Sequence, residues 1–435
     1  EALFAYAEGT IQTPRYRLWN GSTWTAEASA VSVGGSIRFV ETAATQVRNE
    51  YVVATQENGG RVRAQIYNGA TDIFSNLQTI VAAVPGLTSR GYDVAYETSS
   101  GDALVVACNG TEATYSVWNG SSWSGATAIT LAVTANCNWI ELASDPTSDE
   151  IIMVVRDAIT GVTDYEALVW NGSAWGNSMT LGSMAETGDQ GAAVEYEESG
   201  DRAVVVVSNG ANANFSWNSW NGSAWTGVNT QGLADDFENG RLNRDVGTDN
   251  MALCSIDQNG QIALVRWTGS SNTWNAFQTL ELTGNAKTGH PSDCVFETTS
   301  GRDGFIMAPY SDTTNARYQF WNGAILSGEA SISTIQDSQE VRAIRTGDGN
   351  ILSFFYDDVN TQYDFSYWNG TLWSTLETLE TTSITTTAPP TIPFSVVARR
   401  FPTFTEGNVV SSAIDFDEGS GLKWQSVTFS NTPPG

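Results

Sequence analysis

The sequence predicts an all-β β-propeller, in its simplest form a ring of eight four-stranded blades, with seven blades as the alternative. A Trp-Asn-Gly motif or a close variant occurs eight times along the 435 residues, at intervals of 47 to 54 residues. Between the copies, short alternating or apolar runs indicate strands, and helix-favouring charged stretches are scarce. Together these observations indicate one blade per interval.

The motif itself predicts a β-hairpin with two aromatic residues. Its first aromatic residues are Trp19, Tyr67, Trp118, Trp170, Trp220, Trp267, Trp321 and Trp368. A second tryptophan follows in six copies, at Trp24, Trp123, Trp175, Trp225, Trp274 and Trp373. Asn-Gly between two strands predicts a two-residue type I′ turn, which would make the two indoles diagonal neighbours across the hairpin. We interpret these residues as a structural face that fixes the strand register; exposed platforms for sugars are the alternative.

One interval shows the four expected strands. Residues 90–97 and 103–108 flank a turn rich in serine, and residues 114–118 and 122–129 flank the hairpin motif. Four antiparallel strands in about 50 residues are typical of a propeller blade. A solenoid would need shorter parallel turns, and separate sandwich domains would need about twice the length.

The ends of the chain predict how the ring closes. Residues 2–10 align with residues 103–111, so the chain begins at the second strand of a blade whose first strand is missing. Residues 394–400 have the pattern of that missing strand. We therefore expect the N-terminal and C-terminal strands to pair and leave no open seam.

The chain divides into three parts by composition. Residues 1–380 hold the propeller repeats, residues 381–393 form a Thr/Pro-rich connection, and residues 394–435 hold the closing strand and a surplus strand pair. That pair, residues 408–415 and 422–429, could cover the seam, replace N-terminal strands, or pair with the sheet edge of another subunit. The connection fits either O-linked sugar or an extended linker.

Four cysteines occupy corresponding places in two pairs of repeats. We expect two disulfides between blades, Cys108–Cys137 and Cys254–Cys294, and hence an oxidising compartment. Four buried free thiols are the alternative. Because the chain begins at Glu1 and not at methionine, we also expect that a secretory leader has been removed, although a shortened chain would look the same.

Seven N-glycosylation sequons are present, five of them in the hairpin motif. They are Asn20, Asn109, Asn119, Asn171, Asn214, Asn221 and Asn369. Turn chemistry alone explains an Asn-Gly followed by a small residue. Glycosylation of exposed loop tips is the alternative.

Charge and composition exclude several functions. With 20 basic and 48 acidic side chains the formal net charge is −28, which disfavours nucleic acid and anionic membrane surfaces, and no apolar run is long enough to span a bilayer. A single histidine, His290, argues against His-dependent catalysis and multi-His metal sites. We expect no enzyme and no cofactor. Residues 415–419 are similar to part of a calcium loop but lack its remaining ligands, and solvated turns explain the acidic residues better.

The segment Trp118-Asn119-Gly120-Ser121-Ser122-Trp123 resembles a repeat of exported bacterial and archaeal surface proteins, some of them pilin-like. The hairpin is also similar to that of fucose-binding propeller lectins, whose sites use an arginine and a glutamate from neighbouring strands beside an aromatic residue. Here Tyr16 and Tyr115 take the glutamate position in two copies, and no repeated arginine accompanies them.

These resemblances imply a non-catalytic extracellular or cell-surface module with a structural or adhesive role. Its sharper form is an outer subunit of a pilus-like filament, bound to other surface or filament subunits through the C-terminal strands. The alternative is a glycan-binding lectin.

Overall fold

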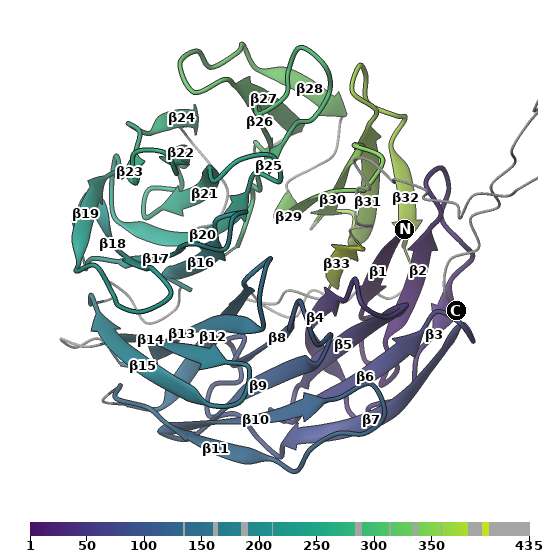
Figure 1. Cartoon of the computed structure of the whole chain (residues 1–435). Helices are drawn as coiled ribbons and strands as arrows, with labels where there is room; N and C mark the ends of the chain where they lie inside the picture. Colours follow the sequence, from purple (N-terminus) through teal and green to yellow (C-terminus); the bar gives the residue numbers. More distant parts are fainter. Residues whose placement is uncertain are drawn as a thin grey trace, which may run out of the picture.

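The computed structural model describes residues 1–133, 135–159, 164–183, 190–210, 212–282, 289–312, 315–333, 338–357, 359–381 and 394–399. These residues form eight antiparallel sheets arranged around one axis, so the fold is an eight-bladed β-propeller (Figure 1). The predicted fold is confirmed, and the seven-bladed alternative is wrong. None of the described elements is a helix that could cross a membrane.

We number the blades I to VIII around the ring and give the strands of each from the axis outward. Blade I consists of β33 (Phe394–Ala398), β1 (Ala2–Tyr6), β2 (Arg15–Trp19) and β3 (Ala28–Ser29). Blade II consists of β4 (Ile37–Ala44), β5 (Glu50–Glu57), β6 (Val62–Asn68) and β7 (Ile73–Val81). Blade III consists of β8 (Tyr92–Tyr96), β9 (Ala103–Asn109), β10 (Glu112–Trp118) and β11 (Thr127–Thr130). Blade IV consists of β12 (Cys137–Ser144), β13 (Glu150–Asp157), β14 (Tyr165–Asn171) and β15 (Trp175–Leu181).

The second half of the ring repeats this plan. Blade V consists of β16 (Ala192–Tyr196), β17 (Ala203–Ser208), β18 (Asn214–Trp220) and β19 (Asn229–Gly232). Blade VI consists of β20 (Phe237–Arg244), β21 (Met251–Asp257) and β22 (Ile262–Thr268), whose outer edge pairs with both β23 (Thr273–Trp274) and β24 (Gln278–Glu281). Blade VII consists of β25 (Val295–Phe296), β26 (Ile306–Ser311), β27 (Ala316–Trp321) and β28 (Ala330–Ser333). Blade VIII consists of β29 (Ser338–Arg345), β30 (Ile351–Asp357), β31 (Gln362–Trp368) and β32 (Glu377–Glu380).

The ring closes in blade I, as the sequence predicts. Strand β33 pairs antiparallel with β1, with Ala2 opposite Ala398 and Tyr6 opposite Phe394 (Figure 1). Phe4 of this blade stacks on Phe354 of blade VIII at 5.1 Å between ring centroids, so the closing blade shares a core with its neighbour. The surplus strand pair and nearly all of the Thr/Pro-rich connection lie outside the described residues.

The second strand of each blade shows why these sequences form stacked sheets. In β17 all six residues, Ala-Val-Val-Val-Val-Ser, are buried. A strand with both faces covered by neighbouring sheets has an unbroken apolar run rather than an alternating one. Burial on both faces is what a blade between two other blades requires.

The hairpin motif differs from the predicted type I′ turn. Trp118 lies directly opposite Trp123 across a four-residue loop, and the same direct pairing joins Trp19 to Trp24. Only the glycine of the loop, for example Gly120, has a positive φ. The reason is the asparagine side chain: Oδ1 of Asn119 accepts hydrogen bonds from the amides of Ser121 and Ser122, at 3.0 Å each, and so holds a longer loop.

One of the two predicted disulfides is formed. Cys108 of β9 and Cys137 of β12 form a disulfide that links blades III and IV. The second expected bond is not formed, and Cys254 and Cys294 are buried thiols. The Sγ of Cys254 lies 3.3 Å from the carbonyl oxygen of Asp293, an interaction in which the thiol donates to backbone.

Candidate functional site

The first aromatic residues of the hairpins join neighbouring blades. They are almost completely buried, and in five of them the indole N–H donates to a glutamate of the preceding blade. The pairs are Trp118–Glu50, Trp170–Glu97, Trp220–Glu150, Trp267–Glu197 and Trp368–Glu297, with N–O distances of 2.5 to 3.2 Å. These contacts fit a structural role for the first aromatic residue.

One of these glutamates should make stability depend on pH. Burial raises the pKa of Glu197 from its ordinary value to about 7. The folded protein therefore binds this proton more tightly than the unfolded chain, so its stabilisation is fully present below about pH 4.5 and is lost as pH rises through about 7, a change of roughly 3 kcal/mol. We expect the melting temperature of Glu197→Gln to fall less between pH 5 and pH 8 than that of the unmodified protein. Parallel curves for the two proteins would contradict this assignment.

The second tryptophans lie at the outer rim and are only partly buried. Trp123 donates its indole N–H to the carbonyl oxygen of Asn76 in blade II, and Trp225 donates to that of Asn177 in blade IV.

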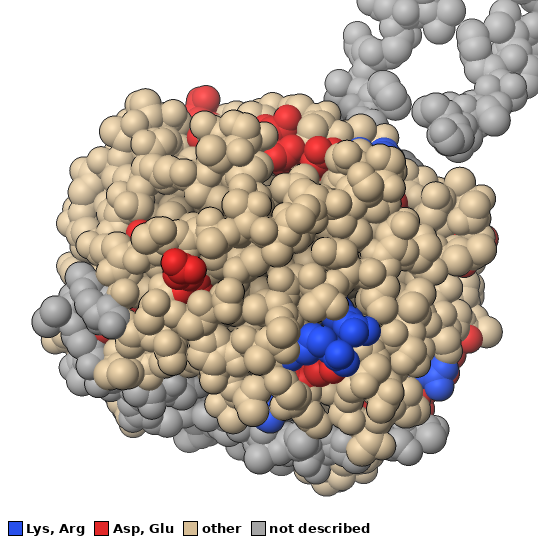
Figure 2. All heavy atoms as spheres, turned by 90° about the horizontal axis from the view of Figure 1, so that it is seen from below, with Lys and Arg blue, Asp and Glu red and all other residues tan. Residues whose placement is uncertain are grey.

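The side of the ring shown in Figure 2 has few charged side chains. One reason is that many carboxylates are buried, including Glu50 and Glu197 of the indole pairs.

Blades I and VII share a cluster of polar residues at the rim. In blade I the hydroxyl of Tyr6 donates to Glu27 at 2.6 Å, and the Nε of Arg15 lies 3.7 Å from the same carboxylate and 3.2 Å from Glu8. Ser29, opposite Arg15 in the register of β2 and β3, accepts a hydrogen bond from its guanidinium.

Blade VII repeats this cluster residue by residue. The hydroxyl of Tyr310 donates to Glu329 at 2.7 Å, and the Nε of Arg317 lies 3.5 Å from Glu329 and 2.8 Å from Asp312. Ser331 again stands opposite the arginine. We call the two clusters the rim sites: Tyr6, Glu8, Arg15, Glu27 and Ser29 in blade I, and Tyr310, Asp312, Arg317, Glu329 and Ser331 in blade VII.

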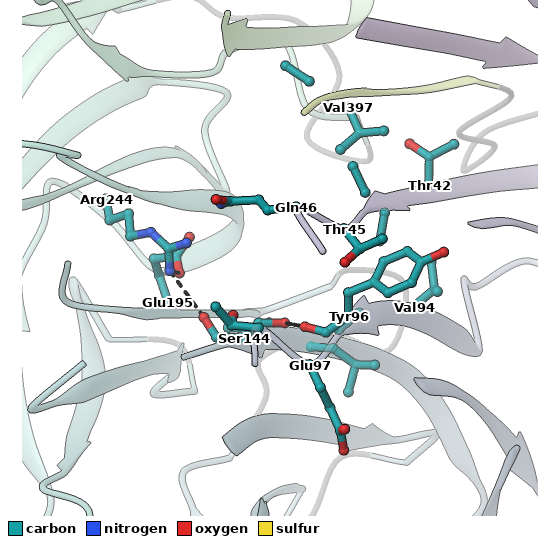
Figure 3. A pocket seen from close by; sticks show the side chains of 17 residues that line it. Thr42, Thr45, Gln46, Val94, Tyr96, Glu97, Ser144, Glu195, Arg244 and Val397 are labelled. Atoms are coloured by element: carbon teal, nitrogen blue, oxygen red, sulfur yellow. Dashed lines mark hydrogen bonds and ion pairs between the residues drawn. The ribbon is translucent and has the colours of Figure 1, made fainter. Parts of the chain in front are cut away.

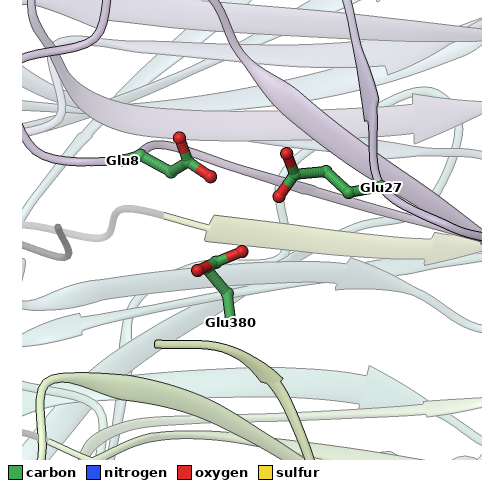
Figure 4. A group of neighbouring side chains, drawn as sticks. All are labelled: Glu8, Glu27 and Glu380. Atoms are coloured by element: carbon green, nitrogen blue, oxygen red, sulfur yellow. The ribbon is translucent and has the colours of Figure 1, made fainter. Parts of the chain in front are cut away.

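Each rim site receives a further glutamate from the preceding blade. The carboxylates of Glu380, Glu8 and Glu27 converge, with oxygens within 4.8 Å of one another (Figure 4). Glu281, the last residue of β24, is close enough to Tyr310 to raise the pKa of its hydroxyl further, after burial and Glu329. Both sites therefore lie between blades, and each holds three carboxylates beside its arginine; in blade I Arg17 also interacts with Tyr6.

The electrostatics of the blade I site reflect this crowding. Burial, and then the neighbouring charge of Glu27, raise the pKa of Glu8. Burial also acts to raise the pKa of Glu27, but hydrogen bonds, first that of Tyr6, outweigh it and lower the pKa. The Arg15 side chain is 25% exposed and the Glu27 side chain 28%, so both can reach a ligand from solvent.

A second polar feature crosses the centre of the ring. Every blade contributes a side chain to one layer on the axis, which we call the axial layer. Its members are Ser395, Glu41, Arg90, Glu141, Gln190, Arg241, His290, Glu340 and Arg342. Ion pairs and hydrogen bonds connect them around the ring, for example Arg90 to Glu141 at 2.6 Å and Arg342 to Glu41 at 3.0 Å.

The axial layer holds His290 in a fixed environment. Its ring bonds Glu340 at 3.3 Å and Gln190 at 2.5 Å. Burial, and then the charge of Arg241, lower the pKa of His290, so the imidazole is neutral at pH 7. Burial would raise the pKa of Glu340, but Arg241 and then His290 outweigh it and hold that pKa at about 2.

The predicted sequons lie at both ends of the blades. Asn20, Asn119, Asn171, Asn221 and Asn369 are in the hairpin loops, where their Oδ1 atoms accept loop amide hydrogens. Asn109 ends β9 at the opposite end of its blade. The loop contacts account for the asparagines by turn chemistry, and their glycosylation stays a prediction. The calcium-like residues 415–419 lie outside the described residues.

No protein-family model and no curated protein matches this sequence. Solved structures do match the fold. AztD from Citrobacter koseri has a TM-score of 0.52 at 11% identity, over 91% of this chain and 97% of that one. The fucose-specific lectin from Aleuria aurantia has a TM-score of 0.46 at 12% identity, over 81% of this chain and 100% of the lectin. At these identities the similarity to AztD shows a shared fold alone.

Sequence reasoning missed both polar features, although each left a signal. The rim-site arginines stand four residues before Trp19 and Trp321, as Arg-Tyr in both copies, and Glu-Ala-Ser follows each hairpin. An arginine therefore does recur, in two copies, and the glutamate of each rim site follows the hairpin, whereas Tyr16 precedes it. From Glu41 to Glu340, successive members of the axial layer are 49 to 51 residues apart in the sequence.

Proposed function

We propose that this chain is a non-catalytic, glycan-binding β-propeller that acts outside the cell, with the two rim sites as its binding sites. The main support is that blades I and VII contain the same complete cluster. Each cluster combines a tyrosine hydroxyl, an acidic residue, an arginine, a glutamate and a serine, so more than the arginine is duplicated. Unlike the buried tryptophans of the Trp–Glu pairs, which also repeat, the arginine and glutamate of both clusters are partly exposed.

The chemistry of a rim site suits a sugar. A carboxylate accepts hydrogen bonds from two neighbouring hydroxyls, and a guanidinium donates several in a fixed plane. Arg15 and Glu27 offer both groups side by side and partly exposed. They also come from neighbouring strands beside a tyrosine, the arrangement that the lectin resemblance implies.

Two sites on one chain support an adhesive role. A molecule that binds two glycans can bridge two chains or two surfaces, and its avidity exceeds the affinity of either site when both are engaged. The adhesive part of the sequence-based hypothesis therefore fits this proposal. The filament role and its subunit partners stay predictions, because the C-terminal strands that motivate them lie outside the described residues.

A glycan array with the full chain tests the proposal. We expect binding of neutral or amino sugars and weak binding of acidic sugars, because each site holds more carboxylates than guanidinium groups. The double variant Arg15→Gln/Arg317→Gln should lose at least about tenfold in affinity, since hydrogen bonds from charged groups contribute about 1.5–3 kcal/mol each. Arg61→Gln, a partly exposed arginine of blade II paired with Glu57, is the matched control and should bind like the unmodified protein. Absence of binding to any glycan, or equal binding by the double variant, would overturn the proposal.

A further inference from the structure

A cavity of about 270 Å³ opens at the mouth of the central channel (Figure 3). It lies at the end of the ring where the first strand of each blade turns into the second, which is the end opposite the rim sites. Its walls come from the inner strands β4, β8, β12 and β33, together with Glu195 of β16 and Arg244 of β20. The cavity is thus distinct from the proposed glycan sites.

The axial layer lies next to this cavity along the inner strands. Along β4, the lining begins at Thr42, directly after Glu41 of the layer. Along β12 it begins at Leu142, directly after Glu141. Ion pairs of the layer, such as Arg90–Glu141 and Arg342–Glu41, therefore lie beside the cavity.

Small and apolar side chains create the space. The alanines that line it are Ala43, Ala44, Ala95, Ala143 and Ala398. Val94, Leu142 and Val397 extend the apolar wall. This wall offers a surface for a short hydrocarbon group.

One wall carries an ion pair. The Nη1 of Arg244 donates to Glu195 at 3.1 Å and to the carbonyl oxygen of Ser144, two blades away, also at 3.1 Å. Its Nε lies 3.2 Å from Glu198. Within the described part of the chain, no acceptor bonds the Nη2 of this arginine, and exposed Gln46 points toward it across the cavity (Figure 3).

From this arrangement we infer that the cavity binds a small zwitterion, of which a free amino acid is the simplest case. The ligand carboxylate meets the Nη2 of Arg244 and the ligand ammonium meets the carboxylate of Glu195, while the ligand side chain covers the alanine and valine wall. A pocket with both charges side by side discriminates against ligands that carry only one. The net charge of −28 further disfavours a free anion.

The volume fits this class of ligand. A cavity of about 150 Å³ already holds a benzene ring, so one of about 270 Å³ holds an amino acid with an aliphatic side chain of several carbons.

Ligand-observed NMR and calorimetry with the full chain test the inference. At about 10 mM, leucine and alanine should bind, whereas acetate, ethylammonium and glucose should not. Arg244→Gln should weaken leucine binding at least tenfold. Ala398 lies at a partly exposed strand end, so Ala398→Leu should fill the cavity and abolish leucine binding while the ion pair stays intact. This second variant keeps the inference testable if Arg244→Gln does not fold. Arg317→Gln at a rim site is the matched control and should leave leucine binding unchanged.

Three results would overturn the inference: no binding of either amino acid, binding of glucose or acetate as strong as that of leucine, or unchanged leucine binding in Ala398→Leu. Glycan-array binding is measured separately, so loss of one activity does not decide the other.

Discussion

Replacing Arg90 by methionine should lower the free energy of unfolding by at least about 3–5 kcal/mol, because it removes the counter-charge nearest to buried Asp93 and to Glu141. The Arg90 side chain is only 3% exposed, and its guanidinium lies 3.0 Å from Asp93, 2.6 Å from Glu141 and 3.5 Å from Glu41. It also stacks at 5.1 Å over the ring of Trp139. Urea denaturation at pH 7 measures the loss.

The matched control for this substitution is Arg61→Met. Arg61 also pairs with a glutamate, but its side chain is 32% exposed, and surface pairs contribute about 0–1 kcal/mol. The loss of unfolding free energy in Arg90→Met should be smaller at acidic pH, because the carboxylates that lack their arginine then take up protons and lose their charge. A deficit no larger than that of Arg61→Met would show that the axial layer does not hold the blades together.

The fold was predictable because one signal repeats. A hairpin motif every 47 to 54 residues indicates blades whatever the details of each turn, and the missing first strand at the N-terminus indicates how the ring closes. The turn geometry was not predictable from Asn-Gly alone. It depends on where Oδ1 of Asn119 finds its donors, and a four-residue loop supplies two amides.

The contacts between blades were harder to predict than the blades. Trp267 bonds Glu197, which is 70 residues earlier in the chain, and only the stacking of blade VI on blade V brings them together. The same holds for Glu380, which joins a rim site whose other members are near the opposite end of the chain. The arginine of that site could have been found by comparing the hairpin copies with one another over a wider window than the motif.

Replacing Trp220 by alanine should cost about 3–5 kcal/mol of unfolding free energy, the usual loss for a large aromatic residue removed from a core. Trp220 is 2% exposed, and its indole N–H donates to Glu150 of the preceding blade at 2.7 Å. The substitution removes the packing and one of two donors to the Glu150 carboxylate, the other being the hydroxyl of Tyr196 at 2.8 Å, which adds to the loss. Urea denaturation measures this, with Trp225→Ala as the comparison.

Trp225 separates the two interpretations of the hairpin tryptophans. It packs at 5.4 Å against Trp220 but is partly exposed at the rim, so Trp225→Ala should cost no more than about 2 kcal/mol. Blade V contains neither rim site, so this variant should keep glycan binding if Arg15 and Arg317 mark the sites. Loss of glycan binding in folded Trp225→Ala would instead show that the rim tryptophans are the sugar platforms, and a loss of stability as large as that of Trp220→Ala would show that both indoles belong to the core.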